Sequence, residues 1–280
     1  MKRLLFAEGR RAARSPLLWL GACILIAISV FEILLSNYGY AISIAGFLWG
    51  HTPLLCILLA ILIPLQIGRE FESRTVNHKI AAGYTRAQIY AVETVVSALC
   101  GLLLFWVDGA AVFVCARIQQ LGLGESVTYG MVGVNAILGS ICVVTISAIF
   151  AAIAMIAHSR LLSMGLSILL ALLLLQAGGE TVSALKQPPY TTDPAGEVAE
   201  NPLYPTGAGR ALTNIHLLVS PFAQAEYQPE LLFETPDDKE NRSLFFQSAA
   251  YHWDFLLVNL LELALLVGAG GYRFRRQDLK

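Results

Sequence analysis

The sequence predicts an all-α polytopic membrane protein with six transmembrane helices, on two observations. Of the 280 residues, 56% are hydrophobic and only 14% are charged, whereas a soluble domain carries about a quarter charged residues. The apolar residues also gather in long uncharged runs. A run of about 20 such residues is long enough to cross the hydrocarbon core as a helix.

Six runs meet this length requirement, and each is predicted to form one transmembrane helix. Ser15 and Pro16 mark the start of the first, because Ser caps a helix and Pro fits its first position. The predicted spans are Leu17–Ser36, Trp49–Ile67, Ile89–Ala116, Tyr129–Ala157, Leu161–Gly178 and Trp253–Tyr272.

The distribution of basic residues predicts the orientation, since Lys and Arg concentrate in cytoplasmic loops. An even number of spans places both termini on the same side, and both are basic. We therefore expect both termini in the cytoplasm. On that topology, most of the 19 Lys and Arg residues lie on the cytoplasmic side. Those on the outer side are Arg117, Lys186, Arg210, Lys239 and Arg242.

The chain divides into four parts. Residues 1–15 read as a basic interfacial helix, although a disordered basic tail is the alternative. Residues 16–175 hold the first five spans, with a polar loop at 68–88. Residues 176–252 are acidic and hold most of the 11 prolines, which predicts an extracellular lid of irregular structure with a short helix at Ala211–Val219. Residues 253–280 hold the last span and a basic cytoplasmic tail.

The sequence lacks the common phosphate-binding and hydrolase motifs. It contains no phosphate-binding GxxxxGK[ST] loop, no HExxH and no GxSxG. The five cysteines lie in apolar runs and form no CxxC pair, so we interpret them as core-filling residues. We expect no catalytic residue, no metal, no cofactor and no nucleic-acid partner, so the chain is not an enzyme, and any energy source is a partner or an ion gradient.

The polar loop Gly68–Tyr90, GREFESRTVNHKIAAGYTRAQIY, is the most informative segment. It is a charged insert between two apolar spans, and Phe71–Ile80 is predicted to form a short helix. Gly83 can end that helix in a left-handed conformation. Thr85 to Gln88 form a capping box that starts the third span. The plainer interpretation is an ordinary charged connector that follows the positive-inside rule.

The segment resembles the first cytoplasmic loop of permease subunits of type-2 ATP-binding-cassette exporters. The resemblance covers Gly68–Tyr90, and six spans with a long outer segment before the last also fit. Arg74 departs from the pattern, because the family often has Gly there. The matching residues are Glu70-Phe71-Glu72-Ser73-Arg74-Thr75, Asn77-His78-Lys79 and Gly83-Tyr84-Thr85-Arg86-Ala87-Gln88-Ile89-Tyr90.

The resemblance implies that this loop is a coupling helix docked on a separate ATP-binding subunit, which binds ATP and Mg²⁺. It also implies a second permease copy or a sister permease, and a bacterial plasma (inner) membrane. It leaves the exported cargo open among lipids, polysaccharides, peptides, drugs and ions. The residues that it assigns to coupling are Glu70, Phe71, Glu72, Arg74, Thr75, Asn77, His78, Lys79 and Arg86.

Acidic residues within the spans are candidates for a transport pathway, because an ionisable group inside a membrane usually faces protein or water. Glu262 lies near the middle of the last span, Asp108 in the outer half of the third and Glu32 near the outer end of the first. A protonated Glu262 satisfied by a neighbouring group is the alternative. Glu93, one turn beyond the polar loop, is expected to tether that loop.

Two other functions stay open. A secondary transporter would use an ion gradient, with Asp108 and Glu262 as ion sites, although the internal repeats common in such folds are not evident. A membrane scaffold or resistance protein would transport nothing. A partner ATPase favours the exporter, and ion-coupled flux without ATP favours the carrier.

Overall fold

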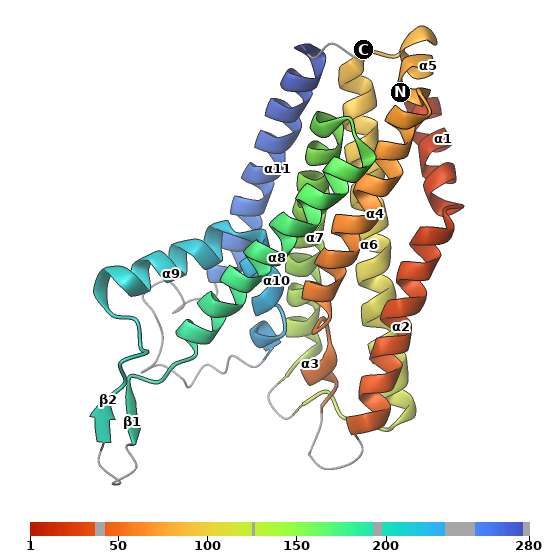
Figure 1. Cartoon of the computed structure of the whole chain (residues 1–280). Coiled ribbons are helices and arrows are strands. Elements are labelled where there is room, and N and C mark those ends of the chain that lie inside the picture. Colours follow the sequence, from red (N-terminus) through yellow and green to blue (C-terminus); the bar gives the residue numbers. More distant parts are fainter. Residues whose placement is uncertain (37–42, 125–126, 193–197, 233–249, 277–280) are drawn as a thin grey trace.

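The computed structural model describes the chain except for residues 37–42, 125–126, 193–197, 233–249 and 277–280. It is an all-α bundle, and six of its helices are long and apolar enough to cross a membrane (Figure 1). The predicted fold class and the predicted number of spans are therefore confirmed. The spanning helices are α2 (Pro16–Ser36), α4 (Thr52–Glu72), α6 (Arg86–Ile118), α7 (Tyr129–Ala157), α8 (Arg160–Leu185) and α11 (Ala250–Arg276).

The helix ends show where the sequence prediction was short. The limits of α7 match those predicted, but α4 continues past Ile67 to Glu72, and α8 continues past Gly178 to Leu185. Both extensions carry polar residues. A prediction based on hydrophobic runs stops at such residues, although the helix continues through them. The extension of α4 removes the first residues of the polar loop from the short helix predicted there.

Helix α7 forms the centre of the bundle, packed against α4, α6, α8 and α11. Small side chains allow the close approach that apolar surfaces in a membrane require. A Cβ atom at Gly101 of α6 would collide with the hydroxyl of Ser147 on α7. Ile146, Phe150 and Met155 of α7 are fully buried, so this helix supplies much of the core.

The basic N-terminus is helical, as α1 (Lys2–Ala13). Leu4 and Ala12 are buried, Phe6 is exposed, and the helix packs against α6. In Figure 1, α1, the short helix α5 (Thr75–Ala81) and the end of α11 lie at one end of the bundle, which we call the α5 end. The short helix α3 (Ile44–Phe47) lies at the opposite end.

The segment between α8 and α11 holds a short antiparallel pair, β1 (Tyr190–Thr192) and β2 (Val198–Glu200), then α9 (Gly207–Val219), α10 (Pro221–Tyr227) and the 3₁₀ turn η1 (Glu230–Leu232). The predicted short helix is present as α9, which starts before Ala211. The β pair is a small correction to the prediction of irregular structure in this segment.

Helix α10 lies within the segment predicted to form a lid, and it packs among α4, α7 and α8. Phe222 and Ala223 are fully buried. Gly178 makes room for them, since a Cβ atom there would lie 2.8 Å from the Cα atom of Ala223. Part of the polar segment is therefore built into the bundle.

Candidate functional site

In the polar loop, α4 ends at Glu72 and the short helix α5 begins three residues later, at Thr75. Phe71 and Glu72 belong to the last turn of α4, and Arg74 has a φ of 53° before α5 begins at Thr75. A left-handed residue ends a right-handed helix, so the predicted helix Phe71–Ile80 was wrong at its start. Arg74 stands where the resembled family often has Gly, the residue that adopts this conformation most easily.

The other end of the loop is as predicted. Gly83 has a φ of 90°. The Thr85 hydroxyl accepts a hydrogen bond from the backbone N–H of Gln88 at 3.3 Å, and the backbone N–H of Thr85 donates to the Gln88 side chain at 3.0 Å. This capping box starts α6 and fixes how α5 joins it.

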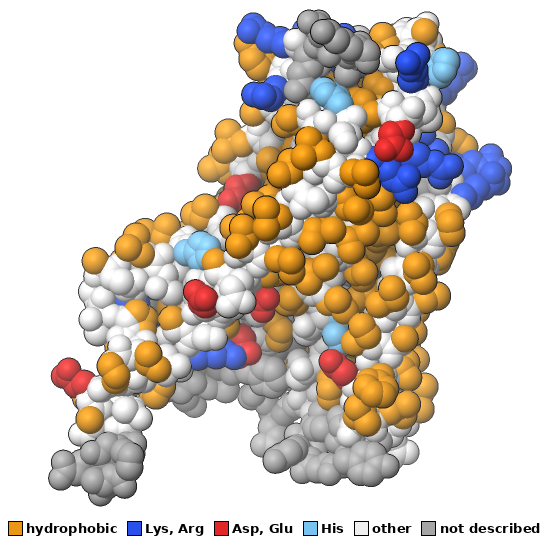
Figure 2. All heavy atoms as spheres, in the orientation of Figure 1, with side chains coloured by type: hydrophobic (Ala, Val, Ile, Leu, Met, Phe, Trp, Pro, Cys, Tyr) orange, Lys and Arg blue, Asp and Glu red, His pale blue; other side chains and the backbone are white. Residues whose placement is uncertain are grey.

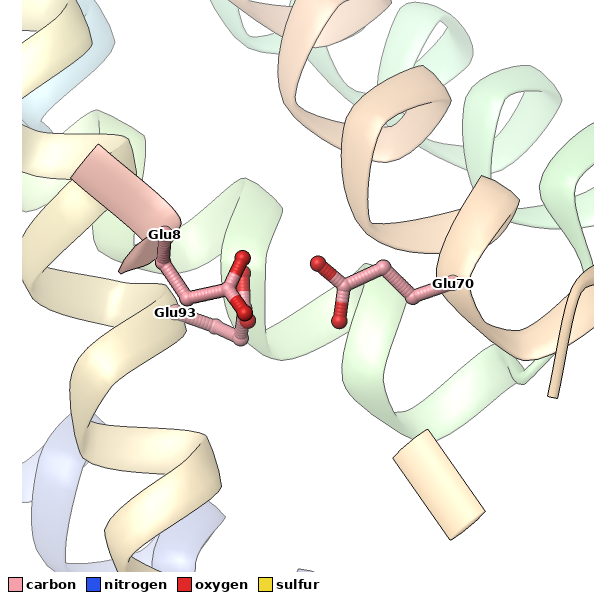
Figure 3. Close-up of side chains that lie close together, drawn as sticks. All are labelled: Glu8, Glu70 and Glu93. Carbon is pink, nitrogen blue, oxygen red and sulfur yellow. The ribbon is translucent and has the colours of Figure 1, made fainter. Parts of the chain in front are cut away.

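Lys79 turns the inner face of α5 into the centre of a buried ion cluster. Its Nζ atom lies 2.5 Å from Oε2 of Glu70, 2.7 Å from Oε1 of Glu93 and 2.9 Å from Oε1 of Glu8. Figure 3 shows the three carboxylates converging from α4, α6 and α1. One ammonium group therefore joins α5 to three other helices.

Arg11 completes this group, which we call the α5-end cluster (Glu8, Arg11, Glu70, Lys79 and Glu93). It pairs with both Glu8 and Glu70. Three carboxylates face two cations, and Oε2 of Glu93 has no hydrogen bond among the described residues. The predicted tether by Glu93 is confirmed. Sequence reasoning missed Glu8 and Arg11, although Glu8 is the only acidic residue before Glu32.

The three carboxylates also have the geometry to hold a cation. Ligand oxygens of Glu8, Glu70 and Glu93 all lie within 4.8 Å of one another. Oxygen ligands of this kind suit Mg²⁺ or Ca²⁺. Lys79, however, already places its ammonium against all three, so a metal ion would have to displace that side chain.

The residues assigned to coupling divide into buried and exposed sets. Glu70 and Lys79 are buried in the cluster, and Phe71 packs edge-on against His158 and Phe274 at 4.8 and 6.4 Å between ring centres. These three support α5. Arg74, Asn77 and His78 are exposed and can meet a partner, and so is Glu72, whose carboxylate also lies 3.8 Å from Arg160.

Thr75 and Arg86 are partly buried. The hydroxyls of Thr75 and Ser73 lie 2.7 Å apart, which links the end of α4 to the start of α5. Arg86 donates to the backbone oxygen of Arg275 at 3.5 Å, which links the start of α6 to the end of α11. Both residues connect elements around α5.

A second buried cluster lies near the opposite end and joins two of the three predicted pathway residues. His51 lies 3.0 Å through Nδ1 from Asp108 and 3.0 Å through Nε2 from Glu32. The Ser29 hydroxyl donates to Asp108 at 2.9 Å. We call these four residues the His51 cluster. His51 and Asp108 are buried, whereas the Glu32 side chain is 47% exposed.

This cluster can hold a proton. A neutral imidazole has one N–H donor, whereas the imidazolium has two, and here both nitrogens face carboxylate oxygens. Protonated His51 would therefore satisfy both Asp108 and Glu32. Sequence reasoning missed His51. It is the one histidine in the run from Ile33 to Gly68, which has no Lys, Arg, Asp or Glu.

Glu262 lies apart from both clusters. It borders a pocket of about 490 Å³ between α7 and α11, whose wall includes Ile149, Leu266 and Pro221 of α10. Among the described residues, its buried Oε2 atom has no hydrogen-bond partner. Arg273 lines the same pocket, so the pocket contains a basic residue that the sequence did not place near Glu262. Asp108 and Glu262 do not form one ion site.

Comparison with models of known protein families and with curated protein sequences finds no match for this chain.

Proposed function

We propose that this protein is the membrane-spanning permease subunit of an ATP-driven exporter, and that α5 receives a separate ATP-binding subunit. The resemblance of Gly68–Tyr90 to the first cytoplasmic loop of type-2 exporter permeases supports the proposal. So does the short helix α5 found there, which is followed by the capping box of α6. ATP and Mg²⁺ bind the partner, and a second copy or a sister permease completes the transporter.

The observation that carries the proposal is the position of Lys79. Its outward neighbours Asn77 and His78 are exposed, while Lys79 itself is buried against Glu8, Glu70 and Glu93. An ordinary connector needs no such anchor. A partner that pushes on the outer face of α5 would therefore move α1, α4 and α6 together.

The mechanism follows from this connection. Closure of two ATP-binding subunits displaces the two copies of α5, and the ion cluster transmits that displacement to the spans. Rigid-body switching of this kind requires a stiff element with different contacts in two states. Helix α5 is short, but the capping box and the cluster hold both of its flanks.

The test is purification from native membranes in mild detergent, followed by mass spectrometry of the chains that co-purify. We expect a stoichiometric ATPase subunit. The double variant Asn77→Ala with His78→Ala should lose that subunit, because both side chains lie on the exposed face. The matched control is Lys2→Ala with Arg3→Ala, two exposed positions on α1, which should retain it.

A second variant separates docking from transmission. Lys79→Arg keeps the positive charge, but a planar guanidinium cannot take the place of the compact ammonium among three carboxylates. The ATPase should still co-purify, while ATP turnover of the complex should fall. If the native protein carries no ATPase, or if the α1 control loses it equally, the proposal is wrong.

The His51 cluster favours one second candidate, an ion-coupled carrier. A proton bound at His51 between Asp108 and Glu32 would link ion occupancy to the packing of α2, α4 and α6. Its test is proton flux in proteoliposomes without ATP. Loss of that flux in His51→Gln, with no ATPase partner recovered, would favour this function over the exporter.

A further inference from the structure

A pocket at the α5 end opens beside the α5-end cluster, and Arg11 and Glu70 of that cluster form part of its wall. The pocket has a volume of about 960 Å³ and is bounded by α1, α4 and the starts of α2 and α8. Figure 2 shows Lys and Arg side chains gathered at this end of the molecule, next to a broad hydrophobic surface. Because the spans α2, α4 and α8 begin or end here, the pocket lies at the edge of the apolar bundle.

Basic side chains dominate the polar part of the pocket. Arg10 and Arg14 come from α1 and its C-terminal cap, Arg69 from the last turn of α4, and Arg160 from the first residue of α8. Gly68 brings Arg160 close, since a Cβ atom at Gly68 would lie 2.6 Å from the Cα atom of Arg160. Five arginines thus line the pocket, and the four that do not belong to the α5-end cluster come from three places in the sequence.

Most of this positive charge is uncompensated. Among the residues that the structure describes, no carboxylate forms an ion pair with Arg10, Arg14 or Arg69. Arg160 lies 3.8 Å from Glu72, and both side chains are largely exposed, at 40% and 52%. Such a surface pair contributes little. By contrast, Arg11 is already engaged by the ion cluster.

The remainder of the pocket is apolar. Leu17 from α2 and Leu62 and Leu65 from α4 line it, and Cys100 of α6 closes its inner part. Leu17 is exposed, and Leu62 and Leu65 are partly exposed. A ligand that fits must therefore carry a negative head group and a hydrocarbon chain in the same molecule.

We propose that this pocket binds an anionic phospholipid. Its phosphate lies among Arg10, Arg14, Arg69 and Arg160, and one acyl chain follows Leu17, Leu62 and Leu65 into the bilayer. Arginine suits this role, because its planar donors match phosphate oxygens in pairs. The bound lipid joins α1 to α4 and α8 next to the α5-end cluster, which borders the pocket through Arg11 and Glu70.

The charge and shape together favour a lipid over other anions. Inorganic phosphate would use the arginines but leave the apolar wall open to water. An uncharged or zwitterionic lipid would fill the apolar wall but would not neutralise the guanidinium groups. The proposal does not depend on a partner ATPase.

The experiment is native mass spectrometry of the purified, delipidated protein titrated with phosphatidylglycerol or phosphatidylcholine. The test variant is Arg14→Gln with Arg69→Gln, and the control is Lys2→Gln with Arg3→Gln. The control makes the same change in charge at exposed α1 positions outside the pocket. Each arginine near an anionic lipid is worth about fivefold in affinity, so the test variant should bind phosphatidylglycerol about 25-fold more weakly.

We expect the wild type and the control to prefer phosphatidylglycerol, and Arg14→Lys with Arg69→Lys to fall between the wild type and the Gln variant. The Lys variant keeps the charge, so it also shows that the pocket needs guanidinium geometry. Equal loss in the control would reveal diffuse surface charge and overturn the proposal. Equal binding of phosphatidylcholine, or full competition by inorganic phosphate at millimolar concentration, would overturn it as well.

Discussion

The two ends of the bundle bury charge in different ways. The α5-end cluster places a lysine ammonium among three carboxylates, with Arg11 at its edge. The His51 cluster places one imidazole between two carboxylates, one buried and one half-exposed. An ammonium offers three N–H donors without changing tautomer, whereas an imidazole offers two only when it is protonated. The first arrangement is a fixed junction, and the second depends on a proton.

This difference separates two possible roles within one protein. The fixed junction lies where α5 meets three helices, so it suits the transmission of movement. The titratable arrangement lies within the predicted spans, where an ionisable group is expensive and is usually functional. Substitutions that remove the central cation from each cluster can therefore test whether the two ends differ in stability or in function.

The largest effect is expected for Lys79→Met. Among the described residues, it leaves three buried carboxylates with Arg11 as their only cation. Removal of one partner from a buried ion pair costs about 3–5 kcal/mol. The unfolding midpoint of the purified protein in detergent should fall strongly. Lys2→Met, which removes the same charge from an exposed position of α1, should leave the midpoint nearly unchanged.

That prediction has an internal check. Lys79→Met with Glu93→Gln removes one charge of each sign, so it should recover part of the lost stability, because coupled sites are not additive. If Lys79→Met is as stable as the Lys2→Met control, the cluster is not a junction, and the contrast between the two ends disappears.

A smaller loss is expected for His51→Leu. Asp108 keeps its hydrogen bond from Ser29, and Glu32 is half-exposed, so water can replace part of what the imidazole supplied. The expected loss is about 2 kcal/mol, the cost of an incompletely satisfied buried polar group. Thermal unfolding of His51→Leu and of His51→Leu with Asp108→Asn measures it, and the double variant should be the more stable of the two. A drop as large as that of Lys79→Met would show that the two ends are equivalent.

The sequence predicts the spans well because each is a long apolar run, and it predicts the start of α6 because a capping box is a local signal. It also predicts that Glu93 tethers the polar loop, since Glu93 lies one turn beyond it. Glu8 and Arg11 could not be placed in the same way. Their position depends on α1 packing against α6, a tertiary contact that no local pattern records.

Two further features escaped prediction for physical reasons. Helix α10 is short and lies within a polar, Pro-rich segment, so no long apolar run marks it, and its close packing depends on the space that Gly178 leaves. The His51 cluster combines residues from three spans, and its central residue is a histidine, which a count of charged residues in the sequence does not include. Asp108 and Glu32 could be identified from their cost in a membrane, but their common partner could not.

Backbone strain offers a finer comparison of the two ends. Arg74, before α5, and Trp49, before α4, both have a positive φ, 53° and 58°. Arg74 is exposed, so Arg74→Gly should relieve strain and raise stability by less than about 1 kcal/mol. Arg74→Ala keeps the Cβ atom and should give no gain. Trp49→Gly should be destabilising instead, because the buried indole stacks on Phe105 at 5.5 Å.

Unfolding midpoints of these three variants decide the point. If Arg74→Gly is no more stable than Arg74→Ala, the left-handed residue before α5 is not strained. The turn would then owe its shape to the flanking helices, and the family pattern of Gly at this position would have no energetic basis in this protein.

The smallest effect is expected for His158, which lies at the α5 end. His158 lies between α7 and α8, packed against Phe71 and Phe274 and without a carboxylate partner among the described residues, and burial lowers its pKa below the ordinary 6.5. Above that value both the folded and the unfolded states hold a neutral imidazole. As the pH falls below 6.5, the unfolded state takes up a proton first, so His158 makes the folded protein less stable in acid.

His158→Asn should therefore reduce the difference between the unfolding midpoints at about pH 7.5 and about pH 5.5, and Asn tolerates the left-handed backbone at this position. His78→Asn, which removes an exposed imidazole from α5, controls for the substitution itself. His51 has two carboxylates to stabilise its charged form, whereas His158 has no carboxylate partner among the described residues. An unchanged pH difference in His158→Asn would mean that burial does not penalise the imidazolium, and the acid sensitivity of the protein would have to come from its carboxylates.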